Sequence, residues 1–339
     1  MTLRPLPGFR HFTTHHCVTG SLRHIYAYND YDISEEMLLG LGAGVSFSYW
    51  HFKGQPPFMG GRGGFRPPLM EEVAGQRTGV VVEWHTTASA RKAERTLLEI
   101  LDAGQPAMIQ CDMGFLPYFD LPEDYHFGWH IVVVCGYDAE TGQVLIADRD
   151  GLHPIAMEDL AQARGSTHKP FPPKHKWYTF DFRQKRPAAA AEVRQAIAEQ
   201  AEAMLEPPIS NVGVKGIRKA AKEALKWPDL LTEDDLRFTL FNTFVFIDAV
   251  GGTGGGIFRY MFSRFLREAA EITGDARLNE SADAFQHIGD RWQAVARFFK
   301  AGWKADDPAA VLPETTAPML EIADLEQAAW DRLRELVRG

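Results

Sequence analysis

Cys17 is the residue best suited to chemistry, and it follows two histidines in the segment HHCVTGSL. Apolar residues with helical spacing continue from it, so it stands at the start of an expected helix. Backbone N–H groups and the helix dipole at such a position favour a thiolate, which is a nucleophile. The same N–H groups could stabilise the oxyanion that forms when a thiolate attacks a carbonyl. The alternative is a small buried apolar residue, which is how most free cysteines behave.

A histidine and an acid on two neighbouring strands could complete a catalytic site. His130 begins the apolar run HIVVVCGYD, and Asp148 ends the next run, QVLIAD. Because the loop between them has hairpin composition, the start of the first strand should lie beside the end of the second. Asp148 would then orient the His130 imidazole, and with Cys17 they are the parts of a thiol-nucleophile triad. The alternative for His130 alone is a hydrogen-bonded cap on its strand.

The elements that must position these residues occupy the first 185 residues. Helical spacing starts at Cys17, a second helix begins near Ser34, and a third covers residues 88–103. The expected strands are residues 80–83, 107–111, 130–136, 143–148 and 177–182. Residues 54–68 are expected to be loop because they are rich in Gly and Pro, and their glycines at 60–64 could cover the active cleft or face solvent. This order of elements predicts an α+β layout.

Residues 186–339 show helical periodicity and no strand signal. The expected helices are residues 187–205, 213–226, 232–249, 256–273, 278–302 and 319–337. Pro-Pro, Trp-Pro, a glycine run, Gly-Asp and a Pro/Thr stretch separate them. This half is therefore predicted to be an all-α domain. Its apolar stripe from Phe238 to Ile247 is expected to be core, with a homodimer interface as the alternative.

Composition excludes several classes of protein. The 339 residues carry a net charge of −9 with dispersed basic residues, so no nucleic-acid partner is expected. No segment has the apolar length of a membrane span, and the N-terminus lacks the apolar core of a signal peptide, which predicts a cytoplasmic protein without a membrane partner. Three cysteines are too few for a disulfide framework. Without a Cys-x-x-Cys or His-Glu-x-x-His motif, no metal is expected.

Several segments resemble a known family. HHCVTGSLRHIYAYND, ISEEMLLGLGAGVSFSYW and GWHIVVVCGYD with its following AD are similar to the N-terminal domain of the butirosin-biosynthesis acyltransferase family. That domain resembles papain-like and bacteriocin-leader (C39-type) cysteine peptidases. FRYMFSRFLREAAEITG resembles the uncharacterised helical domain often fused behind it. The resemblance implies a papain-like cysteine-protease-type domain over residues 1–185 and the all-α domain over residues 186–339.

The resemblance also implies acyl transfer through a cysteine thioester in antibiotic biosynthesis. In the family's pathway, an aminoacyl group leaves the phosphopantetheine thioester of an acyl carrier protein and goes to an aminoglycoside amine. Carried over, Cys17 is the nucleophile, His130 the base and Asp148 the orienting acid. The donor is a carrier-protein or CoA-type thioester, the acceptor is a small-molecule amine, and no resident cofactor is implied.

One position departs from the papain-like pattern. Papain-like enzymes place a glutamine a few residues before the cysteine as an oxyanion donor. This sequence offers only His11 and residues 13–16 there. The Cys17 N–H together with one neighbouring side chain is therefore the expected oxyanion hole.

Further residues are expected to bind substrate, namely His16, Glu35, Glu36, Trp129 and Arg259. The two glutamates could hold a cationic acceptor, or could simply favour the helix dipole. Arg259 follows the glycine run at 251–256 and could help to bind a pantetheine phosphate, with an interhelical turn as the alternative. Two other functions stay open. One is a cysteine peptidase or amidase that uses the same triad, and the other is a non-catalytic binding protein on a papain-like fold.

Overall fold

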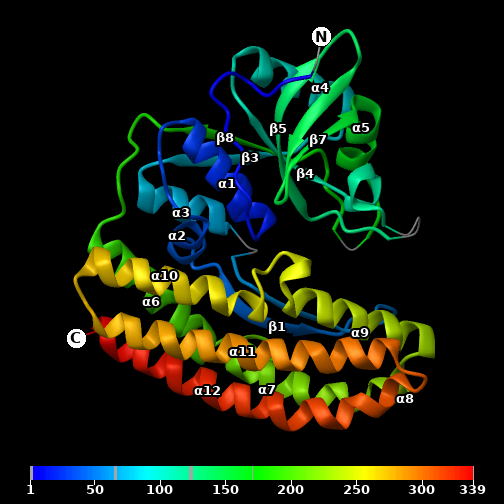
Figure 1. Ribbon diagram of the computed structural model, residues 1–339, viewed down its shortest axis with the longest axis vertical. Coiled ribbons are helices and arrows are strands. Elements are labelled where there is room, and N and C mark those ends of the chain that lie inside the picture. Colours follow the sequence, from blue (N-terminus) through cyan, green and yellow to red (C-terminus); the bar gives the residue numbers. More distant parts are fainter. Residues whose placement is uncertain (1–2, 65–66, 122–124, 170, 339) are drawn as a thin grey trace. The chain divides into compact units, whose positions relative to one another are not determined.

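The chain folds into two compact units. A computed structural model describes residues 3–64, 67–121, 125–169 and 171–338 (Figure 1). Unit 1 consists of Met1–Leu38 and Thr78–Arg186, and unit 2 consists of Leu39–Arg77 and Pro187–Gly339. The architecture is α+β, with a six-stranded sheet in unit 1 and a helical region in unit 2. Leu39–Arg77 thus belongs with the C-terminal helices and not with the rest of the first 185 residues.

The sheet of unit 1 is antiparallel, with strand order β3-β8-β4-β5-β6-β7. Its strands are β3 (Val81–His85), β4 (Ala107–Cys111), β5 (His130–Asp138), β6 (Gln143–Ala147), β7 (Leu152–Ala156) and β8 (Trp177–Asp181). All except β7 lie where strands were expected. β7 is an edge strand that contains Pro154, a residue that weakens the sequence signal for a strand.

Helices cover both faces of this sheet. α4 (Ala90–Asp102) and α5 (Met157–Gly165) pack on one face, over a core shared with the central strands. α1 (Cys17–Tyr28) contacts β5 and adds no residue to that core, so it covers the other face (Figure 1). β5 is accordingly buried along most of its length. α2 (Glu35–Leu41) follows α1 and is capped by Ser34, as expected.

Leu39–Arg77 contains an antiparallel strand pair that the sequence did not indicate. β1 (Val45–Trp50) pairs with β2 (Phe58–Arg62), and α3 (Met70–Thr78) follows. The expectation of loop over residues 54–68 was therefore wrong for β2, while residues 65–66 lie outside the described part of the chain. A Cβ on Gly61 would come within 2.4 Å of the Ile257 side chain, so the glycine permits close packing inside unit 2.

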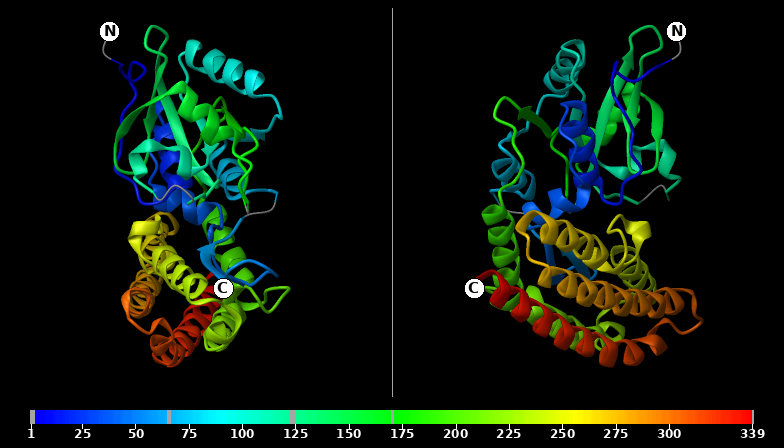
Figure 2. Two further views of the ribbon diagram at one scale, coloured as in Figure 1. Left: turned by 90° about the vertical axis from the view of Figure 1, so that its right-hand side faces the viewer. Right: turned by 60° about the vertical axis from the view of Figure 1, so that its left-hand side comes forward.

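The remaining elements of unit 2 are helical. They are α6 (Ala190–Leu205), α7 (Gly213–Ala224), α8 (Trp227–Leu230), α9 (Glu233–Ile247), α10 (Arg259–Thr273), α11 (Arg277–Lys304) and α12 (Leu312–Arg338). α11 and α12 run side by side (Figures 1 and 2). α12 starts before the expected residue 319 and includes Pro318, because burial of Met319 and Ile322 outweighs the helix-breaking effect of proline. Within the described residues, no helix has the length and apolar character needed to span a membrane.

A fully buried ion pair lies in the core of unit 2. Arg259 on α10 donates to both carboxylate oxygens of Glu326 on α12, through Nε at 2.7 Å and Nη2 at 3.1 Å. The indole N–H groups of Trp292 and Trp330 donate to the same carboxylate. Arg259 Nη1 donates to the Ser46 carbonyl at 2.8 Å. These donors offset the cost of burying the charges.

Loss of this carboxylate is expected to destabilise unit 2 strongly. Glu326→Ala leaves the Arg259 charge buried without its partner, so we expect the free energy of unfolding to fall by about 3–5 kcal/mol. Asp324→Ala is the control on the same helix, because Asp324 pairs with Arg218 at the surface, where such pairs contribute about 1 kcal/mol or less. Urea denaturation followed by circular dichroism measures both variants. Equal losses would contradict the assignment of Glu326 as a core residue.

Candidate active site

α1 begins at Cys17, and a carboxylate from the next helix holds the backbone just before it. His16 precedes the helix in an extended conformation, and its side chain makes no capping bond. Glu35 on α2 instead accepts from the backbone N–H groups of His15 and His16, each at 2.8 Å. Cys17 is partly exposed, whereas the rest of the first turn is buried. The thiol is therefore accessible to a substrate, and hydrogen bonds to Glu35 fix the backbone at the start of its helix.

His130 and Asp148 form a direct hydrogen-bonded pair. His130 Nε2 donates to Asp148 Oδ2 at 2.6 Å, and both side chains are buried. The hairpin brings them together because Val133 lies opposite Ala147, which sets the start of β5 beside the end of β6. Burial alone would raise the pKa of Asp148, but the charge and hydrogen bond of His130 hold it well below its usual range. Asp148 is therefore ionised at neutral pH.

The Cys17 thiol and the His130 ring are near enough for each to shift the pKa of the other. Because Nε2 is committed to Asp148, Nδ1 is the ring nitrogen left for the sulfur. Burial alone would raise the pKa of Cys17, but the neighbouring His16 and His130 lower it well below its ordinary value. Burial alone would lower the pKa of His130, but Asp148 and Cys17 raise it to about 9. At pH values above the lowered pKa of Cys17 and below that of His130, the pair exists as a thiolate and an imidazolium.

The segment before α1 ties the helix start to the end of β6. His11 Nε2 donates to the Asp148 carbonyl at 2.7 Å, and Thr14 N donates to the Arg149 carbonyl at 2.9 Å. Thr14 also packs so tightly on α1 that a Cβ on Gly20 would come within 2.2 Å of Thr14 Oγ1. The His11 ring is thus committed to Asp148 and does not replace the missing glutamine. The backbone N–H groups at the start of α1 remain the candidate oxyanion donors.

The connection between β4 and β5 adds two aromatic side chains that the sequence did not indicate. Tyr118 donates its hydroxyl to Asp148 Oδ2 at 2.9 Å. Phe119 lies edge-on to the His130 ring, with centroids 5.2 Å apart. These contacts restrict the orientation of both members of the pair. No local pattern marks Tyr118, because its bond joins residues that are 30 positions apart.

Some residues expected to bind substrate have other partners. Glu35 is buried at the start of α1, so it does not present its carboxylate to a cationic acceptor. His16 is buried against Thr19 and lowers the pKa of the neighbouring thiol. Arg259 is fully buried and committed to Glu326, so the expectation that it binds a pantetheine phosphate was wrong. The physical reason is the same throughout, since each polar group is satisfied inside the protein.

Trp129 and Glu36 have surroundings that remain compatible with substrate binding. Trp129 directly precedes His130, is half-buried, and packs on the ring of Phe171 with centroids 4.8 Å apart. Glu36 is half-buried next to Glu35. Both roles stay predictions.

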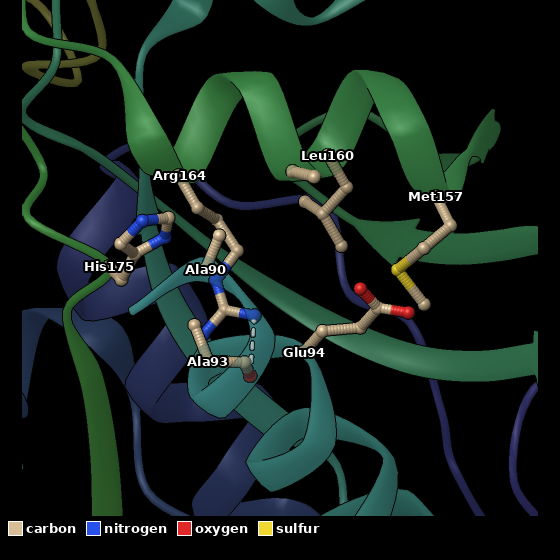
Figure 3. A pocket seen from close by; sticks show the side chains of 8 residues that line it. Ala90, Ala93, Glu94, Met157, Leu160, Arg164 and His175 are labelled. Atoms are coloured by element: carbon tan, nitrogen blue, oxygen red, sulfur yellow. Dashed lines mark hydrogen bonds between the residues drawn. The ribbon is translucent and has the colours of Figure 1, made fainter. Parts of the chain in front are cut away.

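A small recess between α4 and α5 is separate from these residues (Figure 3). It is lined by Ala90, Ala93, Glu94, Met157, Leu160, Ala161, Arg164 and His175. The Arg164 guanidinium is turned toward the Ala93 carbonyl and donates to it at 3.0 Å (Figure 3). Neither Cys17 nor His130 lines the recess. In the part of the chain that the structure describes, no group of three or more His, Cys, Asp or Glu residues could hold a metal ion.

Two family models match the chain. The model described as butirosin biosynthesis protein H, N-terminal, matches residues 16–149, a range that contains Cys17, His130 and Asp148. The model described as a domain of unknown function, DUF4872, matches residues 158–333, just over half of the chain. No curated protein matches the chain. The chain therefore belongs to the DUF4872 family and carries a butirosin biosynthesis protein H N-terminal domain in front of that domain.

Proposed function

We propose that this protein is a cysteine-dependent acyltransferase of antibiotic biosynthesis with a papain-like N-terminal domain. It moves an acyl or aminoacyl group from a carrier-protein or CoA-type thioester to a small-molecule amine. The observation that carries the proposal is the placement of the partly exposed Cys17 at the start of α1, near enough to the hydrogen-bonded pair of His130 and Asp148 for its pKa to be lowered by His130. The butirosin biosynthesis protein H N-terminal model matches a range that contains these residues, which supports the pathway class.

The architecture of unit 1 supports the papain-like assignment. The nucleophile stands at the N-terminus of a helix that covers one face of an antiparallel sheet. The base and the acid come from two neighbouring strands of that sheet. A thiol-nucleophile site needs a base beside the thiol and an acid that orients the base. Such sites are recognised by this geometry and not by the order of the residues along the chain.

Acylation starts from the thiolate–imidazolium pair. Cys17 Sγ attacks the carbonyl carbon of the thioester, a C–S bond forms, and the carbonyl electrons move onto the oxygen. N–H groups at the start of α1 stabilise this oxyanion. The electrons then return, the bond to the donor sulfur breaks, and the His130 imidazolium gives its proton to the departing thiolate. The products are acyl-Cys17, the donor thiol and neutral His130.

Deacylation restores the pair. The acceptor amine attacks the acyl-Cys17 carbonyl, and neutral His130 takes the amine proton. The C–S bond then breaks, and Cys17 leaves as a thiolate next to the His130 imidazolium. The product is an amide. Water in place of the amine gives a carboxylic acid, so the acceptor decides between a transferase and a hydrolase.

Trapping of the acyl-enzyme tests the proposal. Acyl thioesters of N-acetylcysteamine and of CoA serve as donors, and peptide mass spectrometry locates the acyl group. We expect Cys17 to carry it. Cys111 and Cys135 are the internal controls and should stay unmodified, because burial raises the pKa of each thiol to about 12. Addition of an aminoglycoside or a polyamine is expected to discharge the acyl-enzyme as an amide.

Two outcomes would point to other functions. Release of the free acid at a rate that added amines do not change would indicate a cysteine peptidase or amidase. Failure of every donor to modify Cys17 would favour the non-catalytic binding protein.

A further inference from the structure

A second imidazole stands next to Cys17 in the chain, and a buried carboxylate holds its ring through a threonine hydroxyl. His16 Nδ1 lies 3.3 Å from Thr19 Oγ1, and Thr19 Oγ1 donates to Glu35 Oε1 at 3.1 Å. His16, Thr19 and Glu35 are all buried. His16 directly precedes Cys17 in the chain, and its ring lowers the pKa of the Cys17 thiol. A chain of polar contacts therefore runs from Glu35 to a ring that acts on the nucleophile.

The donors along this chain decide which His16 nitrogen carries a proton. Glu35 accepts from the backbone N–H groups of His15 and His16 as well as from Thr19, which suits an ionised carboxylate. Thr19 has one hydroxyl hydrogen and gives it to Glu35, so its oxygen must accept from His16 Nδ1. Neutral His16 thus carries its proton on Nδ1 and its lone pair on Nε2. A negative charge on Glu35 favours the doubly protonated ring.

A carboxylate orients each of the two histidines near Cys17, but the two rings have different roles in the catalytic cycle. Asp148 holds His130 directly, and Glu35 holds His16 through Thr19. His130 gives up a proton during acylation and takes one during deacylation. His16 exchanges no proton with donor or acceptor in that cycle, so its charge can stay constant while the sulfur alternates between thiolate and thioester.

We propose that His16 is a second catalytic histidine, which stabilises the Cys17 thiolate as a protonated donor, and that Thr19 and Glu35 position its ring. The inference rests on Cys17 being the nucleophile of the proposed acyl transfer. In deacylation His130 is occupied by the amine proton at the moment when the sulfur must leave. A separate donor on that sulfur lowers the barrier to C–S cleavage, because it stabilises charge that develops only then.

The titratable groups linked to His16 come from several elements. Cys17 on α1 follows it and also interacts with His130 on β5, and Glu35 on α2 is reached through Thr19 and lies near the charge of Glu36. Burial raises the pKa of Glu35 to about 7, although the N–H donors of His15 and His16 oppose the rise. The Glu35 charge therefore grows as the pH rises through 7, and its hold on protonated His16 grows with it.

Alkylation of Cys17 by iodoacetamide, measured against pH by peptide mass spectrometry, tests the inference. His16→Ala is expected to raise the apparent pKa of Cys17 by about one unit, which slows alkylation roughly tenfold at low pH. Thr19→Val keeps the side-chain shape without the hydroxyl and is expected to give a smaller shift in the same direction. Ser21→Ala is the matched control, because Ser21 is a buried hydroxyl on α1 that bonds to the Ile131 carbonyl. It should leave the pKa unchanged.

A second measurement separates a catalytic role from a structural one. Acyl-Cys17 is formed first, and its discharge by an amine is then timed. We expect His16→Ala to slow this discharge about tenfold. The comparison is made at a pH where thermal melting shows that the variant and the parent are equally folded. Thr19→Val provides the same test if His16→Ala does not fold.

The results distinguish this inference from the proposed function. If the parent has a low Cys17 pKa and folded His16→Ala and Thr19→Val keep it, His16 has no such role and the acyltransferase proposal stands. If the parent thiol itself has an ordinary pKa, both proposals fail.

Discussion

Replacement of Cys17 by alanine is expected to abolish acyl transfer and to leave the fold intact. The thiolate is the atom to which the acyl group is bonded, and no other group in the site can take that role. Removal of a nucleophile typically costs on the order of 10⁴-fold or more in turnover. The substitution removes a single sulfur atom from a partly exposed residue, so it creates little cavity. Turnover of a thioester donor with an amine acceptor, together with the melting temperature, measures both effects.

Cys135→Ala is the matched control for this experiment. Cys135 is a buried thiol on β5, and burial raises its pKa to about 12, so it does not supply a thiolate at neutral pH. We expect this variant to keep its turnover and to lose some stability, because the substitution leaves a small void in the core. Retention of amide formation by Cys17→Ala would show that the acyl group does not pass through Cys17.

Replacement of His130 by alanine is expected to give the next largest loss, on the order of 10³–10⁴-fold in turnover, because the proton carrier of both steps disappears. The same variant should change the ionisation of Cys17. In the parent, the thiol ionises well below its ordinary pKa and His130 stays protonated up to about pH 9. We therefore expect iodoacetamide to label Cys17 rapidly below pH 7. In the variant the rise in the thiol pKa caused by burial is opposed by His16 alone, so labelling moves to higher pH.

His85→Ala is a suitable control for a lost imidazole in unit 1. His85 lies on β3, where its ring bonds to Thr179 and stacks on Trp177, and it has no part in the site. Its substitution should leave the labelling profile of Cys17 unchanged. Identical profiles for the parent and His130→Ala would show that His130 does not control the ionisation of Cys17.

Much of the site could be predicted because its parts depend on short stretches of sequence. Helical spacing after Cys17 placed that residue at a helix start, where α1 does begin. Two apolar runs joined by a short loop predicted the antiparallel pairing of β5 with β6. That pairing alone brings His130 beside Asp148, since the register of a hairpin follows from its loop.

Other features of the site depend on which distant side chains meet. Glu35 sits at a helix start, a position that suits a charge facing solvent, yet it reaches the backbone of His16, 19 residues earlier. Tyr118 has no local signature, and its bond to Asp148 arises because the connection before β5 folds back over that strand. Such contacts leave no periodic pattern in either segment, so sequence spacing cannot indicate them.

The sequence by itself thus determined the helix and strand segments that carry Cys17, His130 and Asp148, because propensity, capping and hairpin pairing act between near neighbours. The tertiary structure decided the rest. Arg259 became a core residue because Glu326, 67 positions away, neutralises it in a buried site. Residues 58–62 became a strand because β1 and the helical unit supply partners that a glycine-rich segment cannot supply itself. In both cases, burial against residues distant in the sequence outweighed the local preference.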